Sequence, residues 1–236
     1  MKIKVIGSGS MWGVDNSASY MIDDDILVDM PNGCCKALKR IGIPVNNIVN
    51  VLITHFHGDH FGDIPFYFLE KLYIDGNKKM NFYCDKKGNN KIVSINNLMF
   101  PSTLDKLEDK VELKYINEES FKINNYYITK YLVQHGNLNP AYGYVFEFDN
   151  KRVGFTGDSS LCSNIEKMAS ICDVLICDCN NVIGNNTHLG INDLEILHSK
   201  FPSCKLYASH LTNESKNKLL NNKNIISLND GDIINI

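Results

Sequence analysis

The sequence predicts an α/β fold in which two mixed sheets pack face to face with helices outside. Three observations predict it. Strand-like apolar runs and helix-like segments occur in both halves of the chain, each half begins strand-rich and turns helical, and no low-complexity linker or short repeat interrupts them. The 236 residues, 44% of them hydrophobic, suffice for one large core. We therefore expect a single domain over residues 1–236.

The first half is expected to begin with strands and end with helices. The predicted strands cover residues 2–7, 19–29 (with an Asp-rich turn inside), 48–54 and 80–85. The predicted helices cover residues 33–43, 60–74, where Pro65 falls in the first turn, and 89–100. The stretch 103–125 is charged and poorly periodic, and we expect surface strands and connections there.

The second half repeats this order. Strands are predicted over 126–136 and 142–148, followed by a turn at Asp149-Asn150-Lys151 and a returning strand, which together indicate a hairpin. Helices are predicted over 163–171 and 191–201, and buried strands over 172–179 and 205–211. Asn192, with Glu195 three residues later, resembles a capping pair that would start the second helix.

Charge and composition exclude several classes of protein. A net charge of -3 gives no global attraction to nucleic acid or to a membrane surface. No run approaches 18 apolar residues, and the apolar start is too short for a signal peptide, so we expect a soluble cytoplasmic protein without a membrane partner. The eight cysteines include no CxxC pair and are expected to be reduced thiols.

A histidine cluster follows the third predicted strand, in the stretch "VLITHFHGDHFGD" at residues 51–63. His55, His57, Asp59 and His60 fall within six positions, and they include three of the chain's seven histidines. Imidazole nitrogens and a carboxylate suit Zn²⁺ or a similar metal. Two imidazoles two residues apart can converge on one ion, while Asp59 and His60 point to another side and hold a second ion.

Here the chain resembles the metallo-β-lactamase superfamily, because "THFHGDH" matches its HxHxDH signature. Further elements follow in that family's order. Asp29 in "ILVDMPNG" resembles a structural aspartate at a strand end, and His135 lies in "VQHGNLNPAYGYVFEF". Asp158 in "VGFTGDSS" resembles the loop that supplies a bridging carboxylate, and His210 in "LYASHL" the last ligand at a strand end.

The resemblance implies a four-layer αββα sandwich and a site with two divalent metal ions. Zn²⁺ is expected, with Mn²⁺ or Fe²⁺ as alternatives, and a hydroxide shared by the metals would be the nucleophile. Dimerisation is also implied. His198, in a helical pattern, has no matched role and is expected to be a surface or packing residue. The implied ligands are His55, His57 and His135 on one metal, Asp59, His60 and His210 on the other, and Asp158 between them.

Two motifs favour the branch that contains ribonuclease Z. Asp158 stands where the best-known zinc β-lactamases carry cysteine, which argues against antibiotic hydrolysis. Asp178 in "DVLICDCN" and His188 in "NNTHLGINDLE" resemble that branch's acid and histidine. The resemblance implies that His188, oriented by Asp178, contacts the phosphate and protonates the leaving oxygen, so we expect Asp59, Asp178 and His188 to be catalytic.

Differences from ribonuclease Z restrict the range of substrates that we expect. Residues 13–19 lack the basic loop of that enzyme, and residues 160–190 hold no basic, glycine-rich arm, so structured tRNA is not expected. A small phosphodiester is favoured instead, such as a cyclic nucleotide, a cyclic ribose phosphate or a short nucleic-acid end. Two alternatives stay open: a hydrolase of a lactone or thioester, and a metal-binding sensor or redox protein. The presence of His57 argues against the sensor or redox alternative, because flavodiiron-type relatives carry a glutamate at this position.

Overall fold

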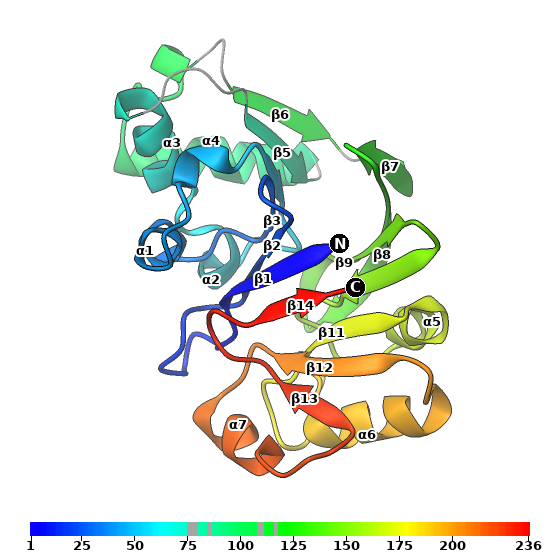
Figure 1. Cartoon of the computed structure of the whole chain (residues 1–236). Coiled ribbons are helices and arrows are strands. Elements are labelled where there is room, and N and C mark those ends of the chain that lie inside the picture. Colours follow the sequence, from blue (N-terminus) through cyan, green and yellow to red (C-terminus); the bar gives the residue numbers. More distant parts are fainter. Residues whose placement is uncertain (75–79, 85, 108–110, 116–117) are drawn as a thin grey trace. The chain divides into compact units, whose positions relative to one another are not determined.

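The computed structural model describes residues 1–74, 80–84, 86–107, 111–115 and 118–236. The chain forms two compact units, one made of residues 1–7, 16–117 and 231–235, the other of residues 8–15, 118–230 and 236. Each unit contains a seven-stranded sheet flanked by helices (Figure 1). The expected mixed sheets with helices are confirmed, while their organisation as a single domain stays a prediction.

The sheet of the first unit has the order β14-β1-β2-β3-β4-β5-β6. Strands β14, β1, β2 and β3 pair antiparallel, whereas β3, β4, β5 and β6 run parallel. The parallel strands end on one edge, where the segment with the histidine cluster leaves β4. The strands are β1 (Lys2–Gly7), β2 (Ser19–Ile22), β3 (Ile26–Val28), β4 (Asn50–Leu52), β5 (Met80–Cys84), β6 (Val111–Tyr115) and β14 (Ile233–Asn235).

The helices of this unit correct one prediction. The helix expected over 60–74 is two helices, because the chain turns at Gly62 and Asp63 before α3 begins. A Cβ at Gly62 would lie 2.4 Å from the carbonyl oxygen of Gly58, so only glycine fits this turn. The elements are α1 (Cys34–Arg40), η1 (Val45–Asn47), α2 (Gly58–Phe61), α3 (Ile64–Tyr73), α4 (Lys86–Met99) and η2 (Asp105–Leu107). The predictions for residues 85, 108–110 and 116–117 lie outside the described residues.

Helix α3 packs on the sheet through aromatic residues. The rings of Tyr67 and Phe68 lie 6.1 and 5.5 Å from that of Phe82 on β5, and all three side chains are buried. Each such side chain stabilises the fold by about 1.5–3 kcal/mol. Lys71 is also buried and donates a hydrogen bond of 2.8 Å to the carbonyl of Asn46, which ties α3 to η1.

The sheet of the second unit has the order β13-β12-β11-β10-β9-β8-β7. Strands β7 to β10 form antiparallel pairs, and β10 to β13 run parallel. The predicted hairpin is confirmed, because Asp149 and Asn150 both have positive φ and Lys151 pairs with Phe148. The strands are β7 (Ser120–Ile123), β8 (Tyr126–His135), β9 (Leu138–Phe148), β10 (Lys151–Phe155), β11 (Val174–Asp178), β12 (Lys205–Ser209) and β13 (Ile225–Ser227).

The helices of the second unit are α5 (Ser163–Ile171), α6 (Ile191–Lys200) and α7 (Asn213–Leu219). The predicted capping pair of Asn192 and Glu195 is wrong. Helix α6 begins two residues earlier than that pair requires, and Asp193 Oδ2 instead accepts a hydrogen bond of 3.0 Å from the backbone N–H of Gly190. The acid that caps the helix is therefore the one at its third position, which is the usual geometry of this motif.

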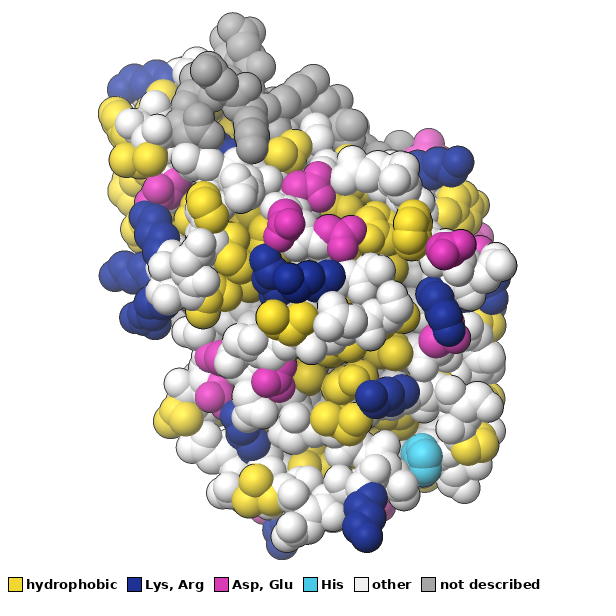
Figure 2. Space-filling view, viewed as in Figure 1, with side chains coloured by type: hydrophobic (Ala, Val, Ile, Leu, Met, Phe, Trp, Pro, Cys, Tyr) yellow, Lys and Arg dark blue, Asp and Glu magenta, His cyan; other side chains and the backbone are white. Residues whose placement is uncertain are grey.

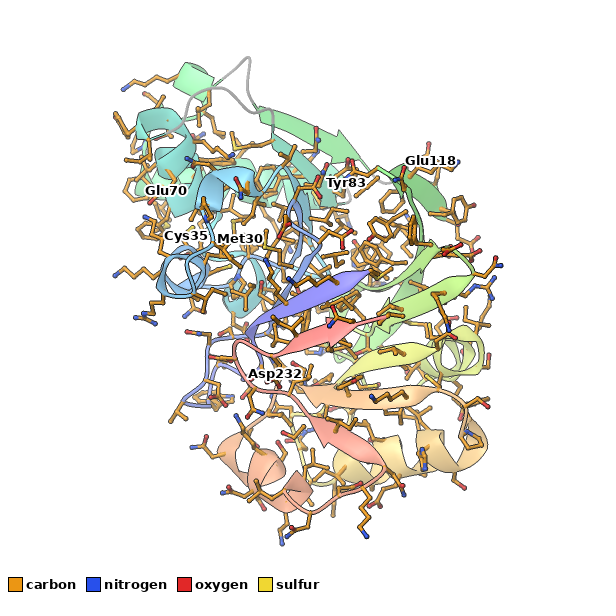
Figure 3. The ribbon with its side chains drawn as sticks, viewed as in Figure 1. Met30, Cys35, Glu70, Tyr83, Glu118 and Asp232 are labelled. Atoms are coloured by element: carbon orange, nitrogen blue, oxygen red, sulfur yellow. The ribbon has the colours of Figure 1, made fainter. Side chains whose placement is uncertain are left out.

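The cysteine side chains carry free thiol groups, most of them buried. All eight cysteines are free, and burial raises the pKa of Cys34 to about 12 and that of Cys35 further, so these thiols stay protonated. Figure 3 shows Cys35 beside Glu70 in the helical part of the first unit. On the face in Figure 2, basic side chains lie among acidic ones, and several basic side chains lie close together along the left edge of the view. No described helix is long and apolar enough to cross a membrane.

Candidate metal and catalytic site

The first unit places the histidine cluster directly after β4. His55 is buried and His57 is exposed, and His55 Nε2 lies 3.1 Å from His57 Nδ1. Two nitrogens bound to one tetrahedral Zn²⁺ at 2.0–2.1 Å would be about 3.3 Å apart. The two rings therefore already hold the spacing that a shared divalent ion requires.

Asp29 orients the third histidine of this unit. Its Oδ2 lies 2.8 Å from His60 Nδ1 and accepts a hydrogen bond of 2.7 Å from the hydroxyl of Thr54. Burial raises the pKa of Asp29, and His60 and Thr54 oppose that rise. With Nδ1 held by this carboxylate, His60 turns Nε2 toward Asp59, whose Oδ2 lies 3.8 Å away.

The second unit brings together two further predicted ligands around Asp158, which is buried. His135 Nε2 and His210 Nε2 lie 3.8 and 3.5 Å from Asp158 Oδ2. His135 Nδ1 is 2.7 Å from the carbonyl oxygen of Thr187, so this ring donates from Nδ1 and presents Nε2 to Asp158. His210 has φ of 53°, a strained conformation of the kind found at functional sites.

Asp178, at the end of β11, contacts both remaining histidines. Its Oδ2 lies 2.9 Å from His188 Nδ1, and its Oδ1 lies 3.4 Å from His210 Nδ1. The backbone N–H groups of Ser159 and Asn180 each donate to this carboxylate at 3.1 Å. Four groups thus fix its position, and the predicted pairing of Asp178 with His188 is present.

The surroundings of His188 favour its protonated form. Burial lowers its pKa, but the hydrogen bond and charge of Asp178, with the charge of Asp158, outweigh burial and raise the pKa above its ordinary value. Its ring stacks on that of His210 at an interplanar angle of 14°, and its side chain is 20% exposed. A partly exposed imidazole whose protonated form is favoured by two carboxylates has the properties that suit a general acid.

The donor set fits divalent metal ions. His60, His135 and His210 each hold Nδ1 against a protein group and turn Nε2 toward a carboxylate, which is how metal-binding histidines are usually oriented. In the second unit, ligand atoms of Asp158, Asp178, His188 and His210 lie within 4.8 Å of one another. Nitrogen and oxygen donors in this combination suit Zn²⁺, Mn²⁺ or Fe²⁺.

Comparison with known proteins identifies the family. A family model described as "Anti-Pycsar protein Apyc1" matches residues 1–230. The chain belongs to this family. Among curated relatives, the Apyc1 protein of Bacillus phage 010DV004 is 28% identical over 34% of this chain and 34% of its own length. Ribonuclease Z of Thermococcus kodakarensis is 28% identical over 55% of this chain and 40% of its own. These matches span less than half of either relative.

Solved structures show the fold. The metallo-β-lactamase fold protein YhfI from Bacillus subtilis has a TM-score of 0.79 and 17% identity, and the match covers 99% of both chains. Zn²⁺-bound PqqB from Methylobacterium extorquens has a TM-score of 0.81 and 14% identity, with both chains covered completely. These findings confirm the superfamily and fold expected from the sequence, and the relatives agree with the expected hydrolase class.

The structure therefore groups the predicted site residues by unit. His55, His57, Asp59 and His60 lie together in the first, and His135, Asp158, Asp178, His188 and His210 in the second. The seven-ligand set drawn from both units stays a prediction. Sequence reasoning missed two contacts, the Thr187 carbonyl at His135 and the Asn180 amide, whose Nδ2 lies 3.2 Å from His210 Nδ1. Asn180 could have been found from the sequence, because it is a polar residue just after the buried strand that ends at Asp178.

Proposed function

We propose that this protein is a dinuclear metal-dependent phosphodiesterase that hydrolyses a small cyclic nucleotide. The pairing of His188 with Asp178 at 2.9 Å carries the proposal, because an imidazole held by a carboxylate can protonate the leaving oxygen of a phosphodiester, and the two residues stand where the ribonuclease Z branch carries its histidine and acid. Family membership supports the substrate class, since Apyc1 proteins degrade cyclic nucleotides. The similarity to ribonuclease Z also supports a phosphodiester as the bond that is hydrolysed.

The proposed ligands are those that the sequence indicated. His55, His57 and His135 would hold one ion, Asp59, His60 and His210 the other, and Asp158 would lie between the two. When bound, two divalent ions supply Lewis acidity at the phosphoryl oxygens and lower the pKa of the attacking water. The buried carboxylate of Asp29 keeps His60 in the tautomer that leaves Nε2 for a metal.

The chain's own residues then manage the proton of the leaving group. Water adds to phosphorus, the ester P–O bond breaks, and His188 Nε2 gives its proton to the departing ribose oxygen. Asp178 Oδ2 accepts the Nδ1–H of the same ring, so its charge stabilises the imidazolium before transfer and fixes the ring's direction. The proton that water loses restores the acid at the end of the cycle.

The test is a substrate panel on the purified, metal-analysed protein. A 3′,5′-cyclic nucleotide and bis-p-nitrophenyl phosphate are assayed beside a lactone and a thioester. We expect turnover of both phosphodiesters, and its loss on chelation with recovery on adding Zn²⁺ or Mn²⁺. Activity confined to the carbon esters would show that the chain belongs to another functional branch, and metal binding without turnover would favour a sensor.

A further inference from the structure

A polar pocket of about 590 Å³ opens in the second unit, among residues adjacent in sequence to the candidate site. Gly136 follows His135 directly, Ser160 lies two residues after Asp158, and Asn186 lies two before His188. The volume falls within the range of about 300–1,000 Å³ typical of small-molecule sites. Neither the metal chemistry nor the proton transfer described above uses this pocket.

Backbone hydrogen bonds hold the walls of the pocket in place. The N–H of Gly136 donates to the carbonyl of Asn186 at 3.0 Å, and the N–H of Ser160 donates to that of Gln134 at 2.7 Å. Asn185 Oδ1 accepts from the backbone N–H groups of Thr187 and His188 at 2.8 and 2.9 Å. The segment that forms one wall is therefore the same segment that positions His188, so the pocket and the acid are linked rigidly.

The lining chemistry selects against phosphate. None of the described residues that line the pocket is a lysine, arginine or histidine, and Asp193 contributes a carboxylate that also caps α6. A phosphate placed here would meet a like charge without a compensating cation. The exposed side chains of Gln134, Asn137 and Asn186 instead offer amide donors and acceptors. A neutral group with hydrogen-bonding edges matches this lining.

We propose that this pocket binds the nucleobase of the substrate, with the phosphodiester directed toward His188. This rests on the proposed function, and it adds the place where the base of the cyclic nucleotide is held and the residues that hold it. Asn and Gln amides carry both a donor and an acceptor, and they pair with base edges that do the same. Asn137 and Asn186 are the residues that recognise the base.

The experiment compares the wild type with the double variant Asn137→Ala/Asn186→Ala. With 3′,5′-cyclic CMP and cyclic AMP we expect KM to rise about tenfold, since two hydrogen bonds of ordinary strength are lost. With bis-p-nitrophenyl phosphate, which has no base, kcat/KM should stay within twofold of the wild type. Asn221→Ala, an exposed asparagine outside the pocket, is the matched control and should change neither value.

Binding of a base without phosphate separates this proposal from the proposed function. Cytidine and adenosine, titrated calorimetrically into the metal-loaded protein, should bind at least tenfold more weakly to the double variant. That result supports the pocket even if no phosphodiester is turned over. Unchanged nucleoside affinity, unchanged KM for cyclic nucleotides, or an equal loss on both substrate types would each overturn the pocket assignment and leave the metal chemistry standing.

Discussion

Asp178 determines the orientation of two imidazoles at once. One carboxylate oxygen lies against His188 and the other against His210, and the backbone N–H groups of Ser159 and Asn180 hold the carboxylate in turn. The side chain of Asp178 is fully buried, so no solvent competes for these contacts. This residue therefore couples the geometry of a predicted metal ligand to that of the predicted acid.

We expect His188→Ala to lower kcat on phosphodiesters by about 10² to 10⁴-fold, the usual contribution of a general acid. Metal content should stay unchanged, because His188 is not among the seven proposed ligands. His198→Ala, on α6 of the same unit, is the matched control and should leave activity unaltered. Metal analysis decides a further point: a loss of metal in His188→Ala would show that His188 is a ligand, as its distance to Asp158 allows.

The amide of Asn180 is expected to position His210. Its Nδ2 lies 3.2 Å from His210 Nδ1, and a half-turn of the amide brings its oxygen there to accept the ring N–H. Asn180→Ala should therefore weaken metal affinity about tenfold or more, as loss of such a partner usually does. Competition with a chromophoric chelator measures this, with Asn221→Ala as control. Equal affinities of the two variants would assign Asn180 a packing role only.

At the scale of elements, the parallel strands explain why the second unit's residues meet. Strands β10, β11 and β12 run parallel, and Asp178 pairs with Ser209, the residue before His210. Asp158 follows β10 on the same edge of the sheet. Residues far apart in the sequence therefore converge because each ends a strand of one parallel set.

The conformation of the turn between β9 and β10 can be tested by its effect on stability. Asp149 and Asn150 have φ of 51° and 59°, the left-handed region that a type I′ turn requires. Asn150→Gly should raise the free energy of unfolding by up to about 1 kcal/mol, whereas Asn150→Val should lower it by about 1–2 kcal/mol. Urea unfolding followed by circular dichroism measures both. A valine variant as stable as the wild type would exclude this turn.

Strands and motif residues could be predicted because their signals are local. Alternation and apolar runs identify strands such as β8 and β11, and metal chemistry restricts the residue types at His55 or Asp158. The break at Gly62 could not be predicted, because it depends on the approach of the Gly58 carbonyl. The contact of His135 with Thr187 was equally hidden, since a backbone carbonyl leaves no side-chain pattern.

At the scale of the molecule, each unit has its own hydrophobic core. One gathers residues such as Tyr67, Phe68 and Phe82, the other residues such as Met168, Leu175 and Leu206. Strand β14 pairs with β1, so residues 231–235 return to the sheet of the first unit (Figure 1), and the carbonyl of Asp232, labelled in Figure 3, accepts from Val5 N–H at 2.9 Å. Most of the second unit, residues 118–230, therefore lies in the sequence between β6 and β14 of the first. A homodimer stays a prediction.

Metal removal should destabilise the protein as well as inactivate it. A ligand present at 100 times its Kd stabilises the folded state by about 2.7 kcal/mol, which for a chain of this size is a Tm shift of roughly 5–10 °C. Calorimetric scans with and without EDTA, followed by Zn²⁺ addition, measure this shift. The double variant His60→Ala/His210→Ala should show a much smaller Tm shift on adding EDTA, because it lacks two of the proposed metal ligands. In the wild type, Asp29 and Asn180 contact Nδ1 of these two rings and leave Nε2 for a metal. An equal EDTA response in this variant and the wild type would place the stabilising metal elsewhere.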